Sequence, residues 1–140
     1  MKKNEDFYKR KLKFFIEVIL DPTARDHEKD DAAMDIVDED LRFGWSSDKR
    51  VIDAIVHASL YPSEEDRTVR SQYGEAIGEI WAYNNIFDLD TYLKLPGTVR
   101  YGIYVSTRYY KSEWVDKYEL KKYGFEDEDD IGKNPKKRKR

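Results

Sequence analysis

The side chains that most often carry enzyme chemistry are few and scattered in this sequence. There are two histidines, His27 and His57, far apart in the chain, and no cysteine, so neither a histidine pair nor a thiolate can bind a metal ion. The chain has no Gly-x-Ser-x-Gly nucleophile elbow and no glycine-rich phosphate loop. We therefore predict a protein that is not an enzyme and that uses no metal ion or other cofactor.

Carboxylates are the one class of reactive side chain that is abundant. Several of them fall on non-core positions of two predicted helices, and a tryptophan follows the first of these helices. These residues are Asp31, Asp35, Asp38, Trp45, Glu75 and Glu79. Like charges gathered on one surface attract a basic partner and raise its association rate. We predict that this set forms a binding surface, with Trp45 as an exposed anchor. The alternative is that the acids only solvate their helices and that Trp45 covers the core.

The stretch from Glu65 to Tyr83 is the predicted helix around which the chain is organised. Its apolar residues recur at steps of three and four, which is one face of an α-helix. They are Val69, Tyr73, Ala76, Ile77, Ile80 and Trp81. Ser63, followed by three acidic residues, is the expected N-terminal cap. Gly74 and Gly78 lie one turn apart on another face of this helix. Each glycine destabilises a helix by about 1 kcal/mol relative to alanine. They predict either the close approach of a neighbouring element or a groove left open for a partner.

The same periodicity predicts further helices on both sides of this one. They span residues 3–20, 23 or 26–38, 48–60, 88–95 and 112–123. Pro22 and Pro96 end two of them, because the residue before a proline disfavours the α conformation. Residues 40–47 are predicted to form a loop. We expect Leu89, Tyr92 and Leu93 to be the buried side of the helix over 88–95.

Residues 98–110 fit two patterns. Their β-branched and aromatic residues alternate as in a strand. In a helix, Val99, Ile103 and Ser106 would share one face instead. Because no other stretch offers a lone strand a partner, we favour the helix.

Length and charge divide the chain into a body and a tail. Its 140 residues suffice for one domain with a sizeable core. Lys133 to Arg140 carry six positive charges, so the formal charge of −3 becomes −9 (−3 − 6) for residues 1–132. We predict a helical domain over 1–125 and a disordered tail over 126–140, acidic and then basic. The basic run matches a nuclear-localisation or nucleic-acid-binding pattern, but short basic runs are common.

The targeting signals in the sequence are weak. No stretch approaches the ~20 apolar residues of a membrane span, and no signal-peptide cleavage pattern follows the apolar residues near the N-terminus. We expect a cytoplasmic protein.

The two halves of the helical body resemble each other. Ala32, Ala33 and Ile36 align with Ala76, Ile77 and Ile80 at an offset of 44 residues (77 − 33). The same offset places Phe7, Tyr8, Leu12 and Ile16 on Val51, Ile52, Val56 and Leu60 in the preceding helices. Helix pairs that recur every 40–47 residues are typical of HEAT and armadillo arrays. The alternative is an ordinary helical bundle with coincidental similarity. We predict an all-α fold, a right-handed HEAT-like solenoid of about six or seven helices.

Two sequence patterns also resemble a known family. Asp66-x-x-Val69-Arg70, followed by Ala76-Ile77-Gly78-Glu79-Ile80, resembles the second helix of a HEAT repeat. The segments 24–35 and 74–81 together are similar to small bacterial HEAT-like immunity proteins, which accompany polymorphic or contact-dependent toxins. The resemblance covers about residues 5–105. The loop at Phe43-Gly44-Trp45, the segment 107–125 and the basic tail depart from it, so the family's contact surface does not transfer directly.

This resemblance implies an immunity protein that binds a cognate toxin and neutralises it by occlusion. The acidic residues would then face a basic toxin, and a nuclease is expected because nucleases that bind phosphate backbones are often basic. The alternative is a HEAT-type adaptor or scaffold that binds a peptide or a nucleic acid. An enzyme that uses the acidic groove is a third hypothesis. The sequence does not specify the oligomeric state.

Overall fold

In the computed structural model, the described residues are 2–43, 49–60 and 67–125, and within them every regular element is a helix. The all-α prediction is therefore confirmed. The helices are α1 (Lys2–Leu20), α2 (Asp26–Phe43), α3 (Lys49–Leu60), α4 (Arg67–Asn84), α5 (Leu89–Lys94), α6 (Gly97–Tyr110), α7 (Ser112–Lys117) and the 3₁₀ helix η2 (Leu120–Tyr123). None of these helices has the length and apolar character that crossing a membrane requires. The predicted tail, 126–140, lies outside the described residues.

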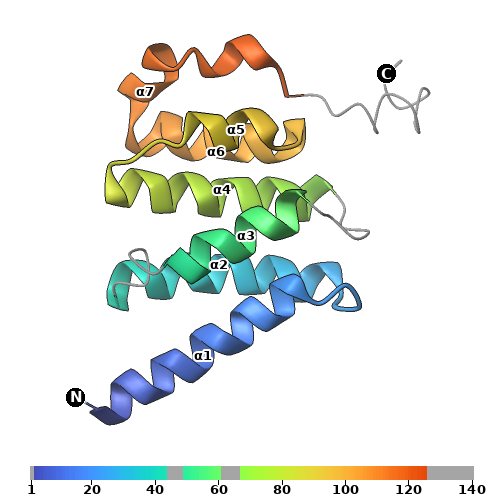
Figure 1. The fold of residues 1–140 in the computed structure, drawn as a ribbon, viewed down its shortest axis with the longest axis vertical. Helices are drawn as coiled ribbons and strands as arrows, with labels where there is room; N and C mark the ends of the chain where they lie inside the picture. The colour runs from blue at the N-terminus through green and yellow to red at the C-terminus, as the bar shows by residue number, and fades with distance from the viewer. Residues whose placement is uncertain (1, 44–48, 61–66, 126–140) are drawn as a thin grey trace.

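The helices form two layers along the long axis of the molecule. Figure 1 shows α2, α4 and α6 one above another, with α3 running obliquely across α2 and α4 and α1 running obliquely below α2. The packing agrees with this view, since α4 contacts α2, α3 and α6, whereas α1 contacts α2 and α3 and α7 contacts α6. Helix α4 is therefore the centre of the fold, as the sequence predicted.

The buried face of α4 is the predicted one. All six of its predicted apolar residues are at most 6% exposed. They pack in a single core with residues of every other helix and of η2. Burial of one such side chain stabilises the fold by about 1.5–3 kcal/mol, so this stripe is the main anchor of the helix.

The glycines of α4 mark a close contact with α6, which confirms the first of the two predictions made for them. A methyl group added to Gly74 would lie 2.0 Å from the carbonyl oxygen of Val99, and one added to Gly102 would lie 2.1 Å from that of Ser71. A methyl group on Gly78 would lie 2.8 Å from the Cβ of Ser106. The two backbones therefore touch with no side chain between them.

Residues 98–110 are helical, as favoured above. Val99, Ile103 and Ser106 are all buried in α6. The hydroxyl of Ser106 donates a hydrogen bond to the backbone carbonyl of Glu75 on α4, at 2.8 Å. Contact with α4 therefore overrides the strand-like alternation of the sequence.

Three local predictions were wrong. Helix α2 continues to Phe43, so residues 40–43 are not a loop; no proline or glycine precedes Gly44 to stop the helix. The helix predicted over 112–123 is interrupted, because Glu119 has a left-handed backbone conformation (φ 49°) between α7 and η2. Leu93 is 44% exposed, since α5 is too short to bury more than one stripe, and Tyr92 occupies the core side.

The burial of the aligned helices bears on the internal repeat. Ala32 and Ala33 on α2 are buried like Ala76 and Ile77 on α4, so the predicted alignment of these helices agrees with their burial. The alignment of α1 with α3 agrees less closely. Ile16 and Leu60 are both half-buried against the core, whereas Leu12 is buried and Val56 is half-buried. The side chains of Phe7 and Tyr8, which belong to the same alignment, are outside those described.

Candidate functional site

The predicted acidic residues lie on two helices that pack against each other. Asp31 and Asp35 are exposed on α2, and Glu75 and Glu79 are half-buried on α4. Asp38 belongs to α2, but its side chain is not among those described, and Trp45 lies outside the described residues. The structure thus places five of the six predicted residues on one pair of neighbouring helices, and the side chains of four of them are described.

The carboxylate of Glu75 lies close enough to those of Glu79 and Asp30 to be repelled by both. Burial raises the pKa of Glu75 above its usual value, and the charges of Glu79 and Asp30 raise this pKa further. Asp30 is half-buried on α2 and was not predicted. It lies three residues before the buried Ala33, a helical step that places both on the same side of α2. That spacing was the signal in the sequence that could have identified it.

At one end of the contact between α4 and α6, a tyrosine of α6 is hydrogen-bonded to a glutamate of α4. The Tyr110 hydroxyl donates a hydrogen bond to Glu79 Oε1 at 2.6 Å. The ring of Tyr109, which is 81% exposed, packs edge-on against Tyr110 with centroids 4.7 Å apart. A cavity of about 250 Å³ opens here, lined by Glu79, Ala82, Tyr83, Tyr110 and Lys111. Sequence reasoning missed Tyr110, because its contact with Glu79 joins residues 31 positions apart.

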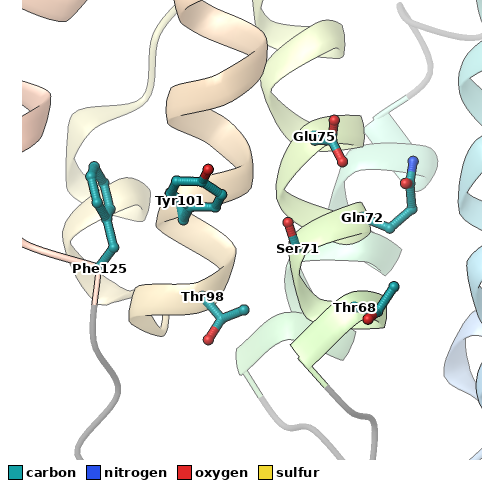
Figure 2. Close-up of a pocket in the computed structure, with 7 residues that line it drawn as sticks. All are labelled: Thr68, Ser71, Gln72, Glu75, Thr98, Tyr101 and Phe125. Carbon is teal, nitrogen blue, oxygen red and sulfur yellow. The ribbon is translucent and has the colours of Figure 1, made fainter. Parts of the chain in front are cut away.

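A larger cavity opens one helical turn away along α4. It has a volume of about 590 Å³. Figure 2 shows its lining, which comes from α4, α6 and Phe125: Thr68, Ser71, Gln72, Glu75, Thr98, Tyr101 and Phe125. Tyr101 is 46% exposed, and its ring meets Phe125 edge-on at 5.6 Å between centroids. The cavity therefore offers a carboxylate, several hydroxyl groups and an aromatic wall.

We call the surface that carries both cavities the α4–α6 seam. It consists of Thr68, Ser71, Gln72, Glu75, Glu79 and Tyr83 of α4 with Thr98, Tyr101 and Tyr110 of α6. A carboxylate can bind a guanidinium or ammonium group through charge-assisted hydrogen bonds. An aromatic face attracts the same cation. The seam is therefore suited to hold basic side chains.

The described residues offer little for metal chemistry. Within residues 2–43, 49–60 and 67–125, no group of three or more histidine, aspartate and glutamate side chains is placed to hold a metal ion.

Comparison of the chain with protein-family models, with curated proteins and with solved structures found no match.

Proposed function

We propose that this protein is a non-enzymatic, HEAT-like immunity protein that binds a basic bacterial toxin and blocks its active site. The observation that carries the proposal is the gathering of Asp30, Glu75 and Glu79 beside exposed tyrosines on one side of α2, α4 and α6. Repulsion among these acids destabilises the free protein, and a cationic partner would relieve it. Tyrosine and arginine are enriched at the centres of protein interfaces.

The arrangement of the helices supports the solenoid part of the proposal. Helices α2, α4 and α6 follow one another in one layer, and each contacts its neighbour in that layer (Figure 1). In a solenoid each helix pair buries its apolar face against the next pair, which leaves an extended surface for a partner. The seam and the exposed acids of α2 would together form such a surface.

The proposed mechanism is occlusion. An arginine or lysine of the toxin would enter the 590 Å³ cavity, where Glu75 accepts its hydrogen bonds and Tyr101 lies beside its charge. A nuclease that binds phosphate groups carries such basic residues at its active site. A row of carboxylates would then occupy the place of the nucleic-acid backbone. A complex of standard size would bury roughly 800 Å² on each partner.

The test is a capture experiment with two charge-reversal variants. The seam variant carries Asp31→Lys, Asp35→Lys, Glu75→Lys and Glu79→Lys. The control carries Asp90→Lys, Glu113→Lys, Asp116→Lys and Glu119→Lys. These four acids are exposed: the first lies on α5, the next two on α7, and the last between α7 and η2. Each immobilised protein is exposed to an extract of cells that express the genes neighbouring its own.

We expect the unmodified protein and the control to capture a basic toxin domain and to protect cells from it. The seam variant should bind the same domain at least about a hundredfold more weakly. Capture of no neighbouring gene product, or equal binding by both variants, would contradict the proposal. Circular dichroism establishes that each variant is helical before binding is compared.

A further inference from the structure

A groove outside the α4–α6 seam lies between α1 and α3. Its volume is about 880 Å³, larger than either cavity of the seam. Neither α1 nor α3 contributes a residue to the seam. Whatever binds in this groove can therefore differ from what binds at the seam.

The groove combines an apolar floor with a basic rim. Leu12, Ile16 and Leu20 form one stripe of α1 at steps of four, and Ala54 of α3 lies opposite them. The basic residues that line the groove are Lys9, Arg10, Lys13, Arg50 and His57. Among the described residues that line it, the acids are Glu17 and Asp53, so this described lining is net positive in a chain whose formal charge is −3. This sign is opposite to that of the seam.

We propose that the α1–α3 groove binds an acidic amphipathic helix of a partner protein. Leu12 and Leu20 are eight residue steps apart (20 − 12), or about 12 Å at 1.5 Å per residue. That length matches two turns of a docked helix, which presents apolar residues at steps of three and four. Acidic residues flanking those apolar positions would then meet Lys9, Arg10 and Lys13, all three of which are exposed.

The floor of the groove favours a helix over a nucleic acid. Leu20 is 44% exposed and Ile16 is half-buried, so an apolar partner would remove from water a surface that a phosphate backbone would leave uncovered. Nucleic-acid sites instead combine basic residues with stacking aromatic rings or with donors to base edges. Among the described residues that line this groove, His57 has the only aromatic ring.

The test uses a synthetic peptide as the probe. It is labelled with fluorescein and has about 20 residues, enough for partial helix formation in water. Its leucines occupy one helical face and its glutamates the remaining positions. A second peptide has the same composition, with the leucines dispersed around the helix. Binding to the full chain is measured by fluorescence anisotropy.

Three variants locate the binding. The groove variant carries Lys9→Glu, Arg10→Glu and Lys13→Glu. The charge-matched control carries Lys94→Glu, Lys117→Glu and Lys122→Glu, which are exposed on α5, α7 and η2. We expect the groove variant to bind the amphipathic peptide about tenfold more weakly or worse, and the control to change binding less than about twofold. Leu20→Asn tests the apolar floor and should weaken binding severalfold.

The outcomes separate this proposal from that for the seam. The seam variant should bind the peptide as the unmodified protein does, whether or not the toxin proposal holds. Equal binding of the dispersed peptide, or no binding of the amphipathic one at millimolar concentration, would overturn the groove proposal. Binding of a short DNA duplex, and not of the peptide, would also overturn the groove proposal. The groove proposal would likewise be wrong if this chain formed a dimer that the groove variant abolished.

Discussion

At the scale of single residues, Glu75 joins the electrostatics of the seam to its cavity. Its carboxylate lines the cavity, and its pKa is raised by burial, by Glu79 and by Asp30. A carboxyl group whose pKa is raised by folding binds its proton more tightly in the folded state. The stability it contributes is thus present below its usual pKa of 4.5 and is lost as pH rises through the raised value.

We therefore expect Glu75→Gln to stabilise the free protein at neutral pH, by about 0.5 kcal/mol, while weakening its binding to a basic partner. The substitution removes a charge that repels two neighbours and keeps the shape of the side chain. Urea unfolding at pH 4 and pH 7 measures the effect, which should vanish at the lower pH. Glu113→Gln, at an exposed position of α7, is the control and should leave the free energy of unfolding unchanged at both pH values.

Tyr92 supplies a second residue-scale prediction. Its buried hydroxyl donates a hydrogen bond to the carbonyl of Leu120 at 3.1 Å, and burial raises its pKa to about 12. Because the unfolded chain releases this proton first, near pH 10, stability should fall between pH 10 and pH 12. Tyr92→Phe should cost about 1–2 kcal/mol at pH 8, since the carbonyl of Leu120 loses its partner.

Urea unfolding from pH 8 to pH 11.5 checks this prediction for Tyr92. The variant should show a shallower loss of stability above pH 10 than the unmodified protein, so the two curves should converge. Parallel curves would show that the hydroxyl group of Tyr92 keeps the same pKa in the folded and unfolded chain.

Periodicity identified the predicted acids of the site, and it could not identify Tyr110. Asp31, Asp35, Glu75 and Glu79 stand at non-core steps of helices, which periodicity reveals directly. The partner of Glu79 is Tyr110, on a helix whose position follows from packing and not from spacing. A single sequence carries no signal for such a contact.

At the scale of elements, the contact between α4 and α6 depends on three glycines. Periodicity identified Gly74 and Gly78 as an unusual pair, and it could not identify the helix that approaches them. The helix boundaries were predicted to within a few residues where a proline or an Asp cap is present, as at Asp88, whose side chain accepts from the backbone N–H of Thr91. The break at Glu119 was not predictable, because glutamate rarely adopts a left-handed conformation.

We expect Gly74→Ala to destabilise the fold by about 3 kcal/mol or more. The new methyl group would meet the backbone of α6 at Val99, and neither backbone can yield without separating the helices. Equilibrium unfolding in urea gives the change in free energy. Gly124→Ala is the comparison: its methyl group meets nothing within 4 Å, but its φ of 71° is strained for alanine, so a loss of only about 1–2 kcal/mol is expected.

A stabilising effect of Gly74→Ala would contradict the close contact. Alanine is favoured over glycine by about 1 kcal/mol in a helix that no neighbour approaches. The sign of the change therefore reports directly on the packing of the two helices.

At the scale of the whole molecule, the order of contacts predicts a gradient of stability. Helix α4 contacts α2, α3 and α6, whereas α7 at one end contacts α6 and η2. In a linear stack the terminal elements have fewer neighbours and open more readily than the central ones. The sequence indicated this order only in part, because the repeat alignment agrees with the burial of α2 and α4 more closely than with that of α1 and α3.

Native-state hydrogen exchange measures this gradient. We expect backbone amides of α4 and α6 to exchange slowest, and those of α1 and η2 to exchange at least about tenfold faster. The same slow rate in the cores of all helices would indicate a single cooperative bundle and would argue against the proposed solenoid.

The backbone contact at Gly74 and Gly102 has a consequence for recognition. Side chains that meet across an interface can slide and change rotamer, whereas two touching backbones leave no such freedom. The two walls of the 590 Å³ cavity should therefore move as one rigid body. A partner that docks there would meet a preorganised surface and would lose little conformational entropy in ordering it, which favours slow dissociation.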